Sequence, residues 1–233
     1  RKLYRQAMQD ELLHNTPNLT VEAGAVEHLL YKDENGRKIV FGIETNDGKQ
    51  YTAKAVVLTA GTFLHGLMHV GDKKTVGGRV GDISCENLTD SLVKLGLRVG
   101  RLKTGTPARL DGTTIDYSKT QKQLGDENPE PFSFMDTAIT VPQIACYVTA
   151  TNKETHQIIR DNMYRAPLFS GQIKGIGPRY CPSIEDKLVK FADRDSHHVF
   201  LEPEGLDDDT VYPNGISTSL PEDVQDAMIH SIA

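Results

Sequence analysis

The sequence predicts a mixed α/β protein, and three features of its 233 residues support this. Apolar residues near 1–14 recur at the three-and-four spacing of a helix face. Residues 19–31, 39–45 and 50–58 read as three strands of a meander, separated by turn residues such as Asn35-Gly36. The second half mixes strand and helix patterns with polar loops. We therefore expect two domains, at 1–103 and 104–233.

In the first half, the helix at 1–14 is predicted to bury one apolar face, formed by Leu3, Ala7, Met8, Leu12 and Leu13. The run at 55–58 is continuously apolar and is followed by Gly61. This pattern favours a strand buried on both faces that ends at a ligand edge. The glycines between 66 and 81 indicate a loop. Ser84 is then predicted to begin a helix with Leu88, Leu92 and Leu95 on one face.

The second half contains three capping signals. Asn152 is predicted to cap a helix that runs to Tyr164, and Ser183 to cap another that runs to Phe191. Ser219 and Glu222 are spaced as a capping box for a last helix, with Pro221 in its first turn. Strands are expected at 144–150 and 199–202.

The composition is that of an ordinary soluble globular protein, with 38% hydrophobic and 25% charged residues and a formal net charge of -6. No apolar run approaches the roughly 20 residues of a membrane-spanning helix, and no signal peptide is recognisable. We therefore expect a cytoplasmic protein with no membrane partner. The chain opens inside one apparent helix and stops in another, so it is expected to be a piece of a longer protein.

Cys181 is the residue most suggestive of chemistry. It precedes a predicted helix N-terminus, where unpaired N–H groups and the helix dipole favour a thiolate, and Arg179 adds a positive charge. Glu185 and Asp186 oppose this effect, and a lone cysteine is more often a small core residue. From the residues alone, both interpretations stay open.

Other signals are weaker. Gly177 and the neighbouring glycines and basic residues suit phosphate binding near a helix start, and Gly77-Gly78-Arg79 could form an anion nest, but ordinary turns look the same. The basic residues between 94 and 109 could follow RNA phosphates, yet no aromatic side chain interleaves them to stack bases.

Several functional classes are disfavoured. The pairs His65 and His69, and His197 and His198, lack the cysteine or carboxylate that would complete a usual metal-ligand spacing, so no metal is predicted. No Gly-x-Ser-x-Gly elbow, Walker loop or His-Glu-x-x-His helix occurs. Redox and group-transfer chemistry remain open.

Four strings together resemble one family. They are AVVLTAGTFL at 55–64, GGRVGD at 77–82, RLKTGTP at 101–107 and GPRYCPSIEDK at 177–187. They are similar in order and spacing to the MnmG family, also called GidA, over essentially the whole chain. The last string is the most specific to that family.

The resemblance implies a fold and two cofactor sites. Residues 1–103 would form part of a glutathione-reductase-like FAD-binding Rossmann domain with a β-meander, and 104–233 an inserted NADH-binding α/β domain. FAD would contact Val26, Ser84 and Cys85. NADH would contact the segment Gly177, Pro178, Arg179, Tyr180, Cys181, Pro182, Ser183, Ile184, Glu185, Asp186, Lys187, Leu188, Val189, Lys190 and Phe191.

The resemblance also implies an activity in which Cys181 is essential. With the GTPase partner MnmE, such an enzyme uses FAD, NADH, a methylene group from tetrahydrofolate and ammonium or glycine. It adds an aminomethyl or carboxymethylaminomethyl group to carbon 5 of a tRNA wobble uridine. The full-length family members are homodimers, and this chain alone is expected to be inactive, because the dinucleotide fingerprint and the C-terminal helical domain are absent from it.

Two alternatives remain at this stage. One is the related FAD- and folate-dependent tRNA uridine methyltransferase, which shares the flavin domain and a thiol-based chemistry. The other, of a different class, is a non-catalytic RNA-binding scaffold on a flavoprotein fold, supported by the basic residues between 94 and 109.

Overall fold

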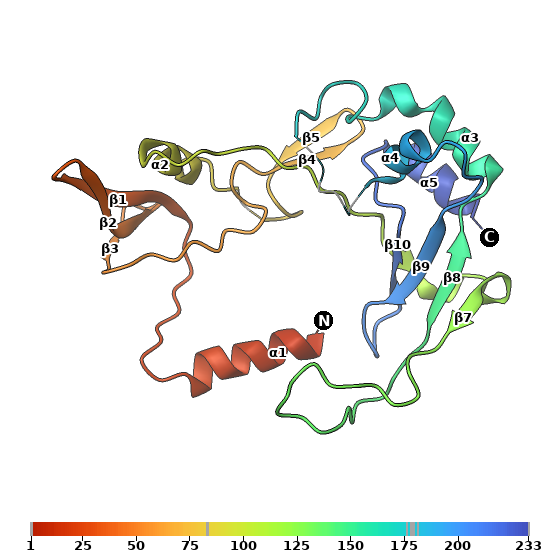
Figure 1. Ribbon diagram of the computed structural model, residues 1–233, viewed down its shortest axis with the longest axis horizontal. Coiled ribbons are helices and arrows are strands. Elements are labelled where there is room, and N and C mark those ends of the chain that lie inside the picture. The colour runs from red at the N-terminus through yellow and green to blue at the C-terminus, as the bar shows by residue number, and fades with distance from the viewer. Residues whose placement is uncertain (1, 83, 176, 178–179, 181, 233) are drawn as a thin grey trace. The chain divides into compact units, whose positions relative to one another are not determined.

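The computed structural model describes residues 2–82, 84–175, 177, 180 and 182–232. The chain forms two compact units (Figure 1). The N-terminal unit is Ala7–Arg101, and the C-terminal unit is Leu102–Ala233 together with Arg1–Gln6. Both units are mixed α/β. The cofactor that the resemblance assigns to each remains a prediction.

A three-stranded antiparallel meander dominates the N-terminal unit, as predicted. Its strands are β1 (Val26–Glu34), β2 (Arg37–Thr45) and β3 (Gln50–Thr52), in the order β1-β2-β3. Asn35 and Gly36 join β1 to β2 with φ of 53° and 76°. Positive φ at both central residues is the geometry of a type I′ hairpin turn, which Asn-Gly favours.

One short helix, α2 (Leu88–Lys94), packs against this meander. Leu88 is buried, and the Ser91 hydroxyl accepts a hydrogen bond from the Leu29 backbone N–H on β1. Ser84 was predicted to begin this helix, and that prediction is wrong by about one turn. Ser84 is held elsewhere: its hydroxyl accepts from the Gly66 N–H and donates to the Phe63 carbonyl.

The glycine-rich stretch contains a hairpin that the sequence pattern did not predict. Its strands are β4 (Leu67–Val70) and β5 (Lys73–Val76). The glycines allow two backbone segments to approach closely. A Cβ at Gly66 would lie 2.7 Å from the carbonyl carbon of Gly77, and one at Gly78 would lie 2.5 Å from the Thr62 carbonyl oxygen. Glycine at positions 66 and 78 is thus explained by packing.

Two burial predictions in this half are wrong. Helix α1 (Lys2–Asp10), continued by a π turn at Glu11–Asn15, forms as expected but buries none of its residues. Residues 53–60 form no strand, and Val57 is 85% exposed. A strand buried on both faces needs neighbours on each side. Among the described residues, no strand pairs with the apolar run at 55–58.

The C-terminal unit is built on a five-stranded antiparallel sheet of order β6-β10-β9-β8-β7. Its strands, in chain order, are β6 (Leu110–Asp111), β7 (Gln121–Gln123), β8 (Cys146–Ala150), β9 (His198–Pro203) and β10 (Thr210–Asn214). Strands β8 and β9 confirm the two predicted there. Short 3₁₀ turns occupy Gly112–Thr114 and Tyr117–Lys119.

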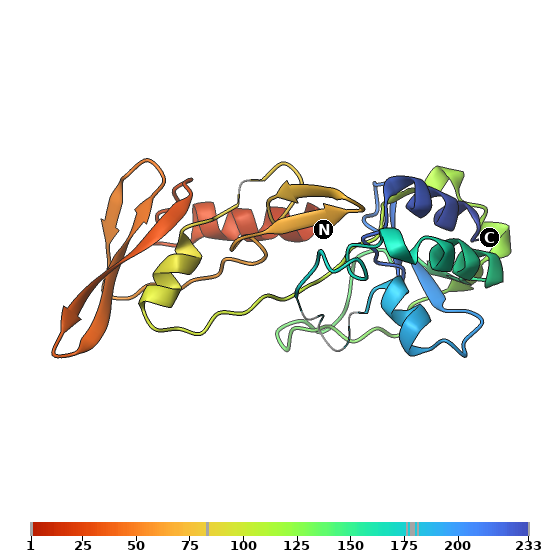
Figure 2. The same cartoon turned by 90° about the horizontal axis from the view of Figure 1, so that it is seen from above.

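Three helices, α3 (Lys153–Asp161), α4 (Ile184–Lys190) and α5 (Glu222–His230), group together beside these strands (Figures 1 and 2). The capping predictions for Asn152 and Ser183 are confirmed, since each forms a reciprocal capping box. A 3₁₀ turn at Met163–Arg165 follows α3.

The predicted capping box of the last helix is wrong. Pro221 itself occupies the N-cap position of α5, and no side chain caps that helix. The backbone N–H of Ser219 instead donates to the Glu185 carboxylate.

The core of this unit lies between the sheet and the helices. It includes Ile159 from α3, Ile184 and Leu188 from α4, and Val224 and Met228 from α5. No helix of the described residues has the length and apolar character needed to cross a membrane.

Two histidines at the edge of the core make this unit sensitive to acid. The His156 and His197 rings stack with centroids 5.4 Å apart, and His156 Nε2 lies 2.8 Å from the Thr151 hydroxyl. Burial is the main cause that lowers the pKa of both imidazoles. The charge of Arg160 lowers the pKa of His156 further, and Asp195 partly opposes this. His156, Lys187 and Arg194 lower the pKa of His197 further. The unfolded chain therefore binds protons more readily.

We expect the stability supplied by these neutral imidazoles to be present above about pH 6.5 and to be lost as the pH falls through their lowered pKa values. The variant His156→Gln should show a smaller drop in melting temperature between about pH 7.5 and about pH 5 than the wild type. The matched control is His230→Gln, whose side chain is 76% exposed. An equal pH dependence in all three proteins would contradict this explanation.

Candidate functional site

Three segments far apart in the sequence meet in the C-terminal unit. They are 103–106, the start of α4 at 182–187, and the loop 215–220 that links β10 to α5. Thr106 pairs with Thr218 in an isolated antiparallel bridge, and the Ile184 N–H donates to the Ser217 carbonyl at 2.8 Å. We call the polar side chains at this junction the polar cluster: Lys103, Ser183, Glu185, Asp186, Lys187 and Thr218.

Lys103 and Asp186 form an ion pair in the polar cluster. Lys103 Nζ lies 2.9 Å from Asp186 Oδ2, and the two side chains are 7% and 20% exposed. Burial raises the pKa of Asp186, but the Lys103 ammonium and the hydrogen bonds from Ser183 outweigh it, so the net pKa is lowered. The carboxylate is therefore ionised at neutral pH.

Glu185 is fully buried and ties α4 to the following loop. Its Oε1 accepts from the Thr218 hydroxyl at 2.8 Å and from the Ser219 N–H at 3.2 Å. Its Oε2 is buried and has no hydrogen-bond partner. A buried acceptor without a donor is costly, and native structures keep few of them.

Lys187 completes the junction by donating from Nζ to the Gly215 carbonyl at 2.7 Å. Gly215 has φ of 113°, and a Cβ there would lie 2.6 Å from the His198 carbonyl oxygen. Glycine is required at this position because a side chain meets both a strained backbone and a steric clash. Successive side chains of α4 thus anchor different backbone segments.

The structure separates the predicted NADH residues into groups. Ile184 and Leu188 are buried in the core, whereas Tyr180 is 86% exposed, and Val189 and Phe191 are about half exposed. Gly177 lies beside the Lys103 side chain, since a Cβ on it would be 3.6 Å from Lys103 Cδ. Pro178, Arg179 and Cys181 lie outside the described residues, so their predicted roles remain predictions.

The predicted FAD residues all lie in the N-terminal unit. Val26 begins β1, and Cys85 forms a parallel bridge with Leu64. Burial raises the pKa of the Cys85 thiol, and Glu27 and Glu86 raise it further, which keeps the thiol protonated. The adjacent His65 has φ of 47°, and its Nε2 is buried without a partner.

The basic residues between 94 and 109 do not form one exposed positively charged surface. Lys103 is buried against Asp186, and Arg109 donates to Glu204 at 2.8 Å and lies over the Tyr212 ring. This pairing weakens the case for an RNA track along the segment. The described residues contain no group of three or more His, Cys, Asp or Glu side chains placed to hold a metal ion.

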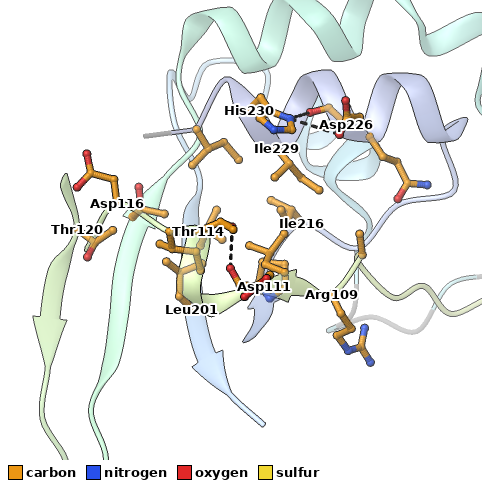
Figure 3. Close-up of a pocket in the computed structure, with 18 of the residues that line it drawn as sticks. Arg109, Asp111, Thr114, Asp116, Thr120, Leu201, Ile216, Asp226, Ile229 and His230 are labelled. Atoms are coloured by element: carbon orange, nitrogen blue, oxygen red, sulfur yellow. Dashed lines mark hydrogen bonds and ion pairs between the residues drawn. The ribbon is translucent and has the colours of Figure 1, made fainter. Parts of the chain in front are cut away.

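A cavity of about 520 Å³ lies elsewhere in the C-terminal unit, between β6, the 3₁₀ turns and α5 (Figure 3). Leu201, Ile216 and Ile229 give it an apolar lining, and Asp111, Asp116 and Asp226 lie around it. None of the predicted cofactor residues that the structure describes lines it. Asp116 lies against Lys119 and Asp226 against His230, and Arg109 also lines the cavity, so basic side chains partly balance its carboxylates.

The sequence reasoning missed the loop 215–220. Gly215 directly after a strand, followed by Ser217, Thr218 and Ser219, was a signal for a close backbone approach with polar anchors. The partners of these residues lie about 30 positions away, in α4. Local patterns do not report such contacts.

The fold and the polar cluster define a class. It is a two-unit α/β protein with an antiparallel meander in one unit. In the other unit, hydrogen-bonded polar side chains hold the start of a helix to two loops. The family described as "Glucose inhibited division protein A" matches residues 1–233. The chain therefore belongs to the glucose inhibited division protein A (GidA) family.

Named relatives agree with this membership. The chain is 55% identical over 223 residues to the "tRNA uridine 5-carboxymethylaminomethyl modification enzyme MnmG" of Helicobacter hepaticus, covering 95% of this chain and 36% of the relative. It is 53% identical to the MnmG of Syntrophotalea carbinolica, covering 100% of this chain and 37% of the relative. The chain thus spans little more than a third of their length.

Solved structures show the same fold. The form I crystal structure of Aquifex aeolicus GidA superposes with a TM-score of 0.88 at 46% sequence identity, covering 100% of this chain and 39% of that one. The form II crystal structure gives a TM-score of 0.86 at 43% identity. The likeness extends through both units.

Proposed function

We propose that this chain is part of an FAD- and NADH-dependent enzyme that modifies tRNA. With the GTPase MnmE, the enzyme adds an aminomethyl or carboxymethylaminomethyl group to carbon 5 of the wobble uridine. One observation carries the proposal: relatives at 50% identity or more, matched along nearly all of this chain, bear the name of that modification enzyme. The same names favour this reaction over uridine methylation.

Cofactor binding is assigned to separate units. FAD fits beside the Ser84 and Cys85 segment, because the His65 imidazole there has a buried Nε2 without a partner that a polar cofactor group would satisfy. NADH is assigned to the segment at the start of α4, which the family resemblance proposes for it and which Ser183, Asp186 and Lys103 hold in place. FAD supplies hydride chemistry, with NADH as its reductant.

Cys181 is proposed as the nucleophile. A thiolate that adds to carbon 6 of the pyrimidine forms an S–C6 bond and moves the electron pair of the C5–C6 double bond onto carbon 5. Ammonium or glycine would displace tetrahydrofolate from the methylene carbon to give an iminium ion. Carbon 5 then attacks the iminium carbon, and the electron pair of the C=N bond moves onto nitrogen. Loss of the carbon 5 proton and expulsion of the thiolate restore the ring. The helix start that follows Cys181 favours the thiolate form.

The protein's own described residues hold this segment in place. The Ser183 hydroxyl and backbone bond to Asp186, and Asp186 bonds to Lys103. We also propose that the full-length protein is a cytoplasmic homodimer that binds tRNA.

The proposal is tested on the full-length protein that carries this sequence. We expect it to purify yellow and to bleach when NADH is added without oxygen, because hydride reaches the flavin. The absorbance near 450 nm gives the rate. A colourless protein that binds tRNA would instead support the RNA-binding scaffold, and a flavoprotein that NADH does not bleach would contradict the NADH assignment.

A further inference from the structure

We propose that Lys103 is a positioning residue for the NADH step, acting through Asp186 to hold the start of α4 in its working arrangement. The inference rests on the proposed function, because the segment that begins at Gly177 is where NADH is proposed to bind. Lys103 itself is assigned no contact with the cofactor. Its role is to fix the residues that make such contacts.

A single oxygen atom, Asp186 Oδ2, links Lys103 to the N-terminal cap of α4. Asp186 Oδ2 accepts from Lys103 Nζ at 2.9 Å, from the Ser183 hydroxyl at 3.1 Å and from the Ser183 N–H at 3.3 Å. The same Ser183 hydroxyl accepts from the Asp186 N–H, which closes the capping box. The cap of α4 is therefore bonded to a lysine 83 positions earlier in the chain.

The surroundings explain why a charge is needed at Lys103. Asp186 is only 20% exposed, and the other cation near it, Lys190 on the same helix, is 62% exposed and lies 3.8 Å from Oδ1. Glu185 and Lys187 are turned to other partners, Thr218 and Gly215. Lys103 is thus the buried counter-charge of the Asp186 carboxylate among the described residues.

Removing this counter-charge should make the cap sensitive to pH. Burial raises the pKa of Asp186, and Lys103 is the main cause that lowers it. Without Lys103, the carboxylate takes up a proton at a higher pH than in the wild type. A protonated carboxyl is a poorer acceptor for the two Ser183 donors, so the start of α4 is released as the pH falls.

The experiment measures NADH-dependent flavin bleaching in the full-length, FAD-loaded protein across a range of pH. Lys103→Met should slow bleaching about 10- to 100-fold near neutral pH, because small misplacements of a binding segment cost rate steeply. Its acid limb should move to higher pH. Lys103→Arg keeps the charge and should restore the rate to within about threefold. The matched control is Lys94→Met, an exposed lysine in the N-terminal unit, which should match the wild type.

Asp186→Asn removes the titrating carboxylate but keeps the size of the side chain, so it separates the effect of the charge from a general effect on folding. It should also slow bleaching but without the shifted acid limb, because the titrating group is gone. The double variant Lys103→Met with Asp186→Asn should be faster than Lys103→Met alone at low pH, since the asparagine side chain does not titrate and keeps an acceptor oxygen for the Ser183 donors. Asp186→Asn, which is compared with the wild type, tests the inference even where Lys103→Met fails to fold, and flavin content and melting temperature would reveal such a failure.

The outcomes are distinct. Wild-type protein that NADH does not bleach overturns the proposed NADH step, and this inference falls with it. Wild-type protein that bleaches, together with a Lys103→Met variant of normal rate and normal pH profile, overturns the positioning role alone. A slow Lys103→Met variant whose pH profile is unshifted and that arginine does not rescue also overturns it.

Discussion

Replacing Cys181 with serine in the full-length protein is expected to abolish modification of the tRNA wobble uridine while leaving the FAD content unchanged. The reason is the nucleophile itself. A serine hydroxyl is not ionised near neutral pH and adds poorly to carbon 6 of a pyrimidine, whereas a cysteine thiolate adds readily. FAD is proposed to bind the other unit, so its content reports folding independently of the nucleophile.

The measurement is mass spectrometry of nucleosides from tRNA incubated with each variant. The matched control is Cys146→Ser in the same unit, because burial and the nearby Glu202 raise the pKa of the Cys146 thiol and keep it protonated. Cys146→Ser should modify tRNA normally. Normal modification by Cys181→Ser would remove the thiol from the proposed mechanism, and loss of FAD from that variant would show a structural defect instead.

Replacing Glu185 with alanine is expected to give the largest loss of stability in the C-terminal unit. Glu185 is fully buried, and the change leaves the Thr218 hydroxyl and the Ser219 N–H without their acceptor. Unsatisfied buried donors cost about 1–3 kcal/mol each, so the free energy of unfolding should fall by roughly 2–6 kcal/mol. The loop 215–220 should loosen first.

Glu185→Gln keeps an acceptor oxygen for both donors and should cost about 1 kcal/mol or less. Glu154→Ala is the matched control, because Glu154 is an exposed glutamate in the first turn of α3. Its effect should stay below about 1 kcal/mol. Urea unfolding measures all three, and hydrogen exchange locates the change. Equal stability of Glu185→Ala and Glu154→Ala would show that the buried carboxylate does not anchor the loop.

Local signals predicted much of the C-terminal unit. Asn152 and Ser183 cap helices as expected, because a capping box is written within four consecutive residues. The Asn35-Gly36 turn also followed from its two residues, since few others adopt positive φ twice in succession. In each case the interaction that decides the structure lies next to the residue that signals it.

The wrong predictions depended on distant partners. The apolar run at 55–58 predicts a buried strand only if other strands flank it, and the described residues supply none. Lys103 appeared to be one of several exposed basic residues, yet it is buried against Asp186, 83 positions away. Ser219 was predicted to cap a helix, but its backbone N–H donates a hydrogen bond to the Glu185 side chain instead.

In the candidate site, too, the parts signalled by local sequence were predicted and the parts that depend on distant contacts were not. The start of α4 was predicted from its glycines, cysteine and capping serine, all within one string of sequence. The segments that hold it, 103–106 and 215–220, became visible in the fold because buried polar side chains join them to α4. The choice of Val26, Ser84 and Cys85 for FAD came from family resemblance and stays a prediction.

The proposed activity is tested most directly by mass spectrometry of wobble-uridine nucleosides in tRNA from cells that lack the gene for the full-length protein. The account predicts that aminomethyl and carboxymethylaminomethyl substituents on carbon 5 disappear and that the wild-type gene restores them. Wobble uridines that keep these substituents in the deleted strain, or a loss of 5-methyluridine at another tRNA position instead, would contradict it.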